Sequence, residues 1–77
     1  MTLQDFIEKF AEQFEETELF LFNPKTKFRE LDEWSSMVTM GLIAMADEEY
    51  GVRLRGDELR KVETIEELYQ LLERLAK

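Results

Sequence analysis

The sequence predicts an all-α fold, a small four-helix bundle of three main helices and one short helix, with a long loop between the first two helices. Apolar residues recur at helical spacing in three segments. Residues suited to capping precede each of those segments. The one strand-like apolar run, residues 19–22, has no second strand to pair with. A chain of 77 residues makes one domain, residues 1–77.

The first helix is predicted to begin after Thr2, whose hydroxyl can cap it, and to end near residue 16 or 17. Charged and amide side chains fill one face. The other face carries the apolar stripe Leu3, Phe6, Ile7, Phe10 and Phe14. An aromatic stripe at this spacing is typical of a packed core.

A long loop follows the first helix. We expect residues 19–22 to pack over the bundle as part of this loop, with room for one helical turn. Asn23-Pro24 marks a turn, and Phe28 and Leu31 are expected to hold the loop against the core. Loops of this length are often functional, and this one leads to Trp34 and two serines.

The second main helix is predicted from Ser36 to Tyr50, with Ser35 or Ser36 as N-cap and Gly51 as C-cap. On a helical wheel, one side forms an ordinary core stripe of Thr39, Leu42, Ile43, Ala46 and Tyr50. The opposite side carries Met37, Met40, Gly41 and Ala44 and ends in Asp47 and Glu48.

The outer side of this second helix is unusual because residues 36–46 include no charged residue. The helix is either buried on all sides or meets a partner. A chain this short has little material to bury a helix completely. We therefore interpret the methionine side as a docking face, since methionine adapts to varied partners. A homodimer interface is a further possibility.

The remaining chain is predicted to form an extended connection and two helices. Val52 and Leu54 alternate with arginines, and Asp57 is expected to cap a short helix that ends at Lys61. Thr64 and Glu67 form a capping-box pattern for the last helix. Its predicted buried stripe is Ile65, Leu68, Tyr69, Leu72 and Leu75.

Composition excludes several classes of function. The net charge of -8 disfavours nucleic acid and anionic membranes and favours basic protein surfaces. With no histidine and no cysteine, Ser-His catalysis, disulfides and His/Cys metal sites are excluded. The acidic run at residues 47–49 is interpreted as a solvated helix end. No apolar run approaches the ~20 residues of a membrane span, and no signal peptide is evident. We expect a cytoplasmic, monomeric protein that is not an enzyme.

One set of residues resembles the acyl carrier protein family. The set comprises Phe28, Leu31, Ser35-Ser36-Met37, Leu42 and the acidic-aromatic residues 47–51. The family's pattern is Asp-Ser-Leu at the start of the second helix, so Ser35 and Met37 replace its Asp and Leu. Val38 and Gly41 stand where the family frequently has acidic residues. The resemblance covers about residues 3–75 in helix order and spacing.

The resemblance implies an acyl carrier. Ser36 would bear a 4′-phosphopantetheine arm, attached from coenzyme A with magnesium by a phosphopantetheinyl transferase. Acyl or related groups would travel on it as thioesters to acyl-transferring or ligase-type enzymes with basic docking surfaces, as in fatty acid or polyketide biosynthesis. The expected partner contacts are Ser35, Met37, Met40, Gly41, Ala44, Asp47 and Glu48. The alternative is an unmodified helical interaction module that docks through the methionine face, with Ser36 as a plain cap.

Overall fold

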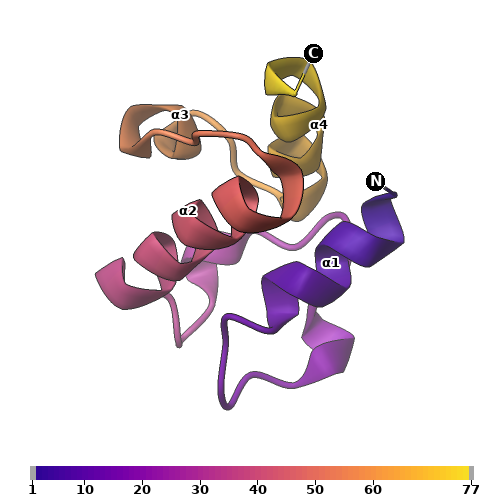
Figure 1. Ribbon diagram of the computed structural model, residues 1–77. Coiled ribbons are helices and arrows are strands. Elements are labelled where there is room, and N and C mark those ends of the chain that lie inside the picture. Colours follow the sequence, from indigo (N-terminus) through magenta and orange to yellow (C-terminus); the bar gives the residue numbers. More distant parts are fainter. Residues whose placement is uncertain (1, 77) are drawn as a thin grey trace.

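The computed structural model describes residues 2–76, and in this part of the chain it contains helices and no strand. The all-α prediction, with three main helices and one short one, is confirmed (Figure 1). The α-helices are α1 (Leu3–Ala11), α2 (Ser36–Tyr50), α3 (Gly56–Arg60) and α4 (Ile65–Leu75). Two short 3-10 turns, η1 (Leu19–Leu21) and η2 (Phe28–Glu30), lie in the loop between α1 and α2.

The helix α1 ends earlier than predicted, at Ala11 rather than near residue 16. The N–H groups of Gln13 and Phe14 bond to carbonyls three residues back, at 3.1 and 3.0 Å, so the backbone tightens into a turn. The next three N–H groups bond to the carboxylate of Glu33 instead of continuing the helix. The glutamates beyond Ala11 also disfavour a longer helix, because their negative charge would lie near the negative end of the helix dipole.

The core is built around a continuous set of aromatic rings. Phe10 lies at its centre, within 6.1 Å (ring centroid to ring centroid) of four other phenylalanines. Those four are Phe6 and Phe14 from α1 and its following turn, and Phe22 and Phe28 from the long loop. All five are buried. Phe22 and Phe28 therefore make the loop part of the core. The expectation that residues 19–22 pack over the bundle holds only for Phe22, since Leu19, Phe20 and Leu21 are exposed.

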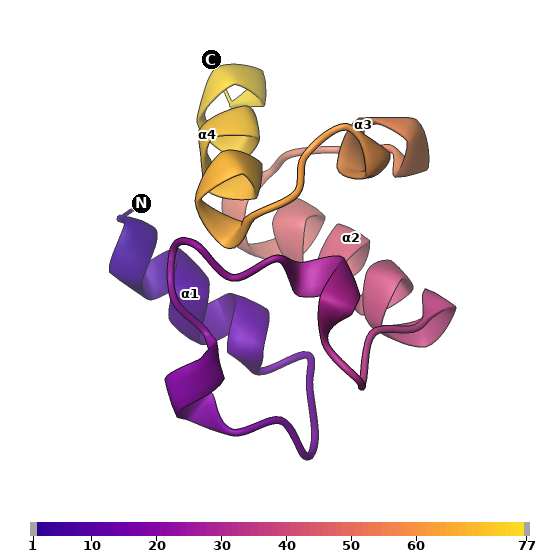
Figure 2. The same cartoon turned by 180° about the vertical axis from the view of Figure 1, so that it is seen from behind.

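The long loop also supplies hydrogen-bond acceptors to the start of α4. It runs past that end of the helix in Figure 2. The first N–H groups of a helix have no partner inside the helix. Here the Ile65 N–H donates to the Thr26 carbonyl at 3.1 Å, and the Glu66 N–H donates to the Pro24 carbonyl at 3.0 Å. Lys27 and Thr64 form an isolated antiparallel bridge. This position of the loop fixes the segment that leads into α2.

The predicted helix ends are largely confirmed. Thr2 caps α1, and Thr64 and Glu67 form a reciprocal capping box at α4. Gly51 ends α2 in the left-handed conformation (φ 65°), which glycine adopts without strain. The expected cap at Asp57 is wrong. The helix α3 begins at Gly56, and the Glu58 carboxylate accepts a hydrogen bond from the Arg55 N–H at 2.9 Å.

The buried side of α2 is rotated from the predicted stripe. Val38 and Met45 are buried, together with the expected Leu42 and Ala46. The other three predicted members, Thr39, Ile43 and Tyr50, are only half-buried. In α4, Leu71 is buried and Leu75 is exposed, against the prediction. An apolar residue at the edge of a stripe becomes buried only if a neighbouring element covers it, and helical spacing does not specify that neighbour.

Candidate functional site

The two serines at the start of α2 have different roles. Ser35 is the N-cap: its hydroxyl oxygen accepts from the Val38 N–H at 3.3 Å, and its carbonyl accepts from the Thr39 N–H at 2.9 Å. Ser36 is the first helical residue and is exposed. Its hydroxyl forms no hydrogen bond within residues 2–76. The structure therefore assigns the cap to Ser35 and leaves the Ser36 hydroxyl accessible.

The start of α2 is electrostatically suited to an anionic group. The first turn of the helix carries no acidic residue. Among the described residues, the backbone N–H groups of Ser36 and Met37 have no acceptor. Unpaired N–H groups and the helix dipole place partial positive charge at this end. A negative group attached at Ser36 would be stabilised by that charge.

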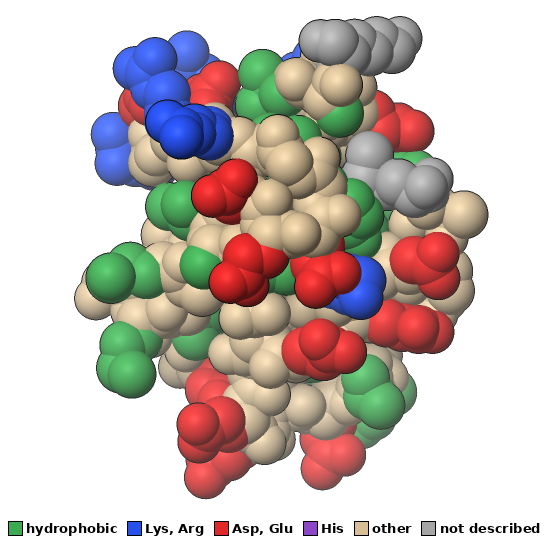
Figure 3. All heavy atoms as spheres, in the orientation of Figure 1, with side chains coloured by type: hydrophobic (Ala, Val, Ile, Leu, Met, Phe, Trp, Pro, Cys, Tyr) green, Lys and Arg blue, Asp and Glu red, His purple; other side chains and the backbone are tan. Residues whose placement is uncertain are grey.

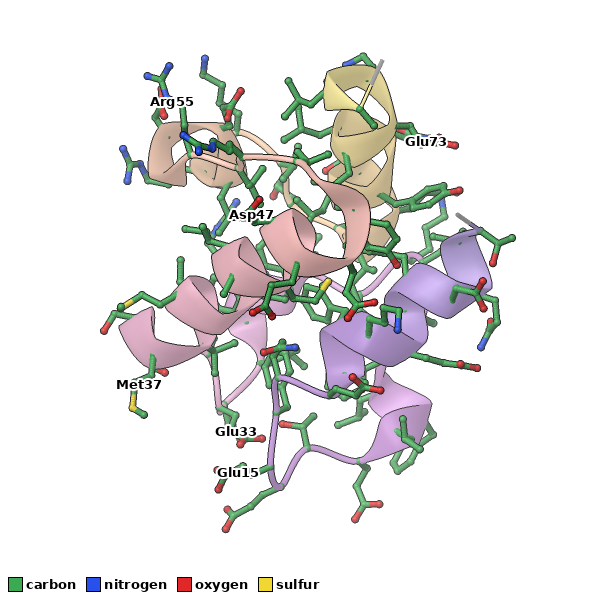
Figure 4. All side chains as sticks on the ribbon, viewed as in Figure 1. Glu15, Glu33, Met37, Asp47, Arg55 and Glu73 are labelled. Atoms are coloured by element: carbon green, nitrogen blue, oxygen red, sulfur yellow. The ribbon has the colours of Figure 1, made fainter. Side chains whose placement is uncertain are left out.

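The predicted docking face of α2 is on the surface. Met37 and Met40 are 82% and 69% exposed, and Met37 extends away from the start of the helix in Figure 4. Apolar side chains project at the same edge of the molecule in Figure 3. Ala44, Asp47 and Glu48 are exposed further along the helix. The structure thus brings Ser36, the methionines and the two carboxylates to one exposed side of α2.

Gly41 and Val38 differ from the rest of this face. Gly41 is half-buried because the Gln13 side chain lies over it, and a Cβ built there would meet Gln13 Oε1 at 2.7 Å. Val38 is buried, so it is a core position and does not belong to the exposed face. An open hollow of about 300 Å³ lies beside the start of α2, lined by Gln13, Ser35, Met37, Val38 and Gly41 together with Glu15 and Glu33.

Glu33 connects the turn after α1 to the segment that enters α2, and it lies beside Glu15 in Figure 4. Its carboxylate accepts from the N–H groups of Glu15, Glu16 and Thr17 at 2.7, 3.0 and 2.8 Å. It also accepts from the Thr17 hydroxyl at 2.6 Å. These bonds hold the chain only three residues before Ser36. Sequence reasoning missed this role because the bonded groups are 16–18 residues apart and follow no local pattern.

The Glu33 contacts favour the charged carboxylate. The Thr17 hydroxyl, followed by the backbone N–H groups, lowers the pKa of Glu33 from 4.5 to about 2. A carboxyl whose folded pKa is depressed stabilises the fold above its unfolded pKa. That stabilisation is lost as the pH falls through the folded pKa. The loss is therefore expected between about pH 4.5 and about pH 2.

We expect Glu33→Gln to lower the melting temperature at neutral pH, because a neutral amide cannot replace a carboxylate that accepts four hydrogen bonds. The difference from the wild type should shrink between about pH 4.5 and about pH 2. Thermal unfolding followed by circular dichroism across that range measures both effects. Asp32→Asn is the matched control, since Asp32 is exposed and forms no hydrogen bond in the described part of the chain. Equal pH dependence in the wild type and Glu33→Gln would contradict the prediction.

The described residues were also compared with the requirements of a membrane span and of a metal site. None of the helices is both long and apolar enough to cross a lipid bilayer. Within residues 2–76, no three acidic side chains are grouped so as to hold a metal ion. Comparison with protein-family models, curated proteins and solved structures yields no match to the chain.

Proposed function

We propose that this protein is an acyl carrier whose 4′-phosphopantetheine arm is attached to Ser36. The observation that carries the proposal is the division of roles at the start of α2. Ser35 supplies the cap, and the Ser36 hydroxyl stays exposed and unbonded within the described residues. The cap therefore occupies one hydroxyl and leaves the other available for modification. The residue pattern of the acyl carrier family places its modified serine at this position.

The residues around Ser36 fit a phosphodiester. The unpaired N–H groups of Ser36 and Met37 favour a negative group, and the first turn has no carboxylate to repel it. Ser35 orients the helix end through its cap, and Glu33 holds the preceding segment. The arm, once bound, would supply a thiol that carries cargo as a thioester. The chain itself needs no general base and no cysteine for this role.

Partner enzymes would dock on the exposed side of α2. Met37 and Met40 offer apolar contact beside the serine, and Asp47 and Glu48 offer charge farther along the helix. Charge complementarity mainly raises the association rate, whereas apolar packing mainly slows dissociation. A transferase or ligase-type enzyme with basic groups around an apolar pocket matches this arrangement.

The test is transfer of the arm in vitro. The purified protein is incubated with coenzyme A, magnesium and a phosphopantetheinyl transferase of broad specificity, and its intact mass is measured. We expect the mass to rise by one phosphopantetheine group. Ser36→Ala should abolish the increase, whereas Ser35→Ala should be labelled despite losing about 0.5–2 kcal/mol of capping energy. If labelling is lost in Ser35→Ala and retained in Ser36→Ala, the arm is attached to Ser35 and the proposal is wrong.

The second candidate function is an unmodified interaction module. The high exposure of Met37 and Met40 favours this module, because exposed methionines can bind a partner directly. Such binding does not require a modified serine. The same mass measurement separates the two candidates. A folded protein that several transferases leave unlabelled supports the module and contradicts the carrier.

A further inference from the structure

A second apolar surface is formed by Leu19, Phe20 and Leu21, here called the η1 patch. Leu19 and Phe20 are 71% and 77% exposed, and Leu21 is also exposed. In Figure 3, apolar side chains gather over this turn, at the lower right of the view. Single exposed apolar residues are ordinary on protein surfaces. Three consecutive large ones form a patch, which requires a reason.

The η1 patch is held in place by contacts on both sides. Phe22, the next residue, is buried against Phe10 and Phe14 with ring centroids 5.9 and 5.0 Å apart. The Phe22 N–H donates to the Leu19 carbonyl at 3.0 Å, and the Thr26 hydroxyl donates to the Leu21 carbonyl at 2.6 Å. The patch is therefore presented on a fixed turn and does not belong to a loose loop.

Carboxylates border the η1 patch on one side. An open hollow of about 390 Å³ next to it is lined by Leu21, Leu31 and Thr17, by Glu33, and by the three carboxylates of Glu16, Glu18 and Asp32. These three carboxylates are exposed and form no ion pair within the described part of the chain. The result is an apolar surface with an acidic border.

The η1 patch is separate from the exposed side of α2. In Figures 1 and 2, which view the molecule from opposite sides, η1 and the start of α2 lie at opposite edges. Glu33 lines both the hollow beside the η1 patch and the hollow beside the start of α2, whereas Met40 lines neither. The two surfaces can therefore be tested independently.

We propose that the η1 patch is a second docking surface, and that its partner is a protein presenting an apolar pocket bordered by lysine and arginine. The acidic border selects a basic partner by charge complementarity. A second copy of the chain would bring the same carboxylates together, on a protein with a net charge of -8. An anionic lipid surface would be repelled by the same charge.

The test uses two synthetic amphipathic helical peptides of matched length, one of leucine and lysine and one of leucine and glutamate. Each is titrated into the ¹⁵N-labelled protein, and amide chemical shifts are recorded. We expect the lysine peptide to shift the amides of residues 15–22 and Asp32, and we expect weaker binding at higher salt. The glutamate peptide should produce no shifts.

Variants identify the surface. Phe20→Ser should weaken lysine-peptide binding roughly tenfold or more, as expected for an exposed aromatic anchor. Met40→Ser is the matched control. The affinity read from the amide shifts of residues 15–22 should change by less than about twofold in this variant, because Met40 lies on the other surface. The Ser36→Ala variant should bind like the wild type, so failure of the carrier proposal leaves this result unaffected. Unchanged circular dichroism of Phe20→Ser verifies its fold.

Three outcomes would overturn the proposal. The first is a set of shifts centred on α2, with binding lost in Met40→Ser and retained in Phe20→Ser. The second is a dimer in sedimentation velocity that Phe20→Ser converts to a monomer, which would assign the patch to a second copy. The third is Phe20-dependent co-sedimentation with phosphatidylcholine–phosphatidylglycerol vesicles, which would assign it to a membrane.

Discussion

Phe10→Ala is expected to lower the free energy of unfolding by about 3–5 kcal/mol, the usual cost of truncating a buried phenylalanine. Phe10 is 0% exposed and contacts four other phenylalanine rings, two of them from the long loop. A small domain has a total stability of about 5–15 kcal/mol, so this loss is a large part of it. Urea unfolding followed by circular dichroism measures the change.

Phe20→Ala provides the matched control for Phe10→Ala, since it removes the same ring from an exposed position. Its free energy of unfolding should change by less than about 0.5 kcal/mol. If Phe10→Ala is unfolded at all urea concentrations, Phe10→Leu keeps most of the side-chain volume and gives a measurable midpoint. Equal stabilities of Phe10→Ala and Phe20→Ala would contradict the position of Phe10 in the core.

Phe28→Ala is expected to cost a similar amount, about 3–5 kcal/mol, and also to disturb the approach to α2. Phe28 is 0% exposed, and its ring lies between Phe10 and Trp34 at centroid distances of 5.8 and 5.1 Å. Its N–H donates to the Glu63 carbonyl at 3.3 Å. Removing the ring therefore removes the loop's contact with Phe10 and with Trp34, which lies two residues before Ser36.

Trp34 reports this second effect of Phe28→Ala, because it is the one tryptophan of the chain. Half-buried in the wild type, it should become more exposed, and its native-state fluorescence should shift to longer wavelength. Phe20→Ala should leave the fluorescence unchanged, since the Phe20 ring is exposed. A destabilised Phe28→Ala variant with unchanged fluorescence would show that Phe28 does not position Trp34.

Most of the fold follows from local patterns in the sequence. The capping residues Thr2, Thr64 and Gly51 act through groups within a few residues of them, so the sequence predicts them correctly. The apolar spacing of residues 3–14 likewise predicts which side of the first helix is buried. At the candidate site, the start of the second helix and the exposure of Met37 and Met40 were predictable for the same reason.

What the sequence determined by itself was the helical class, the order of the helices and the position of two serines at the start of the second one. The tertiary structure decided where the first helix ends and which apolar residues of the loop are buried. Glu33 holds the chain that follows the first helix through bonds to residues 16–18 positions away, and Phe22 is buried while Phe20 is not. Such outcomes depend on contacts between distant segments, which local periodicity does not encode.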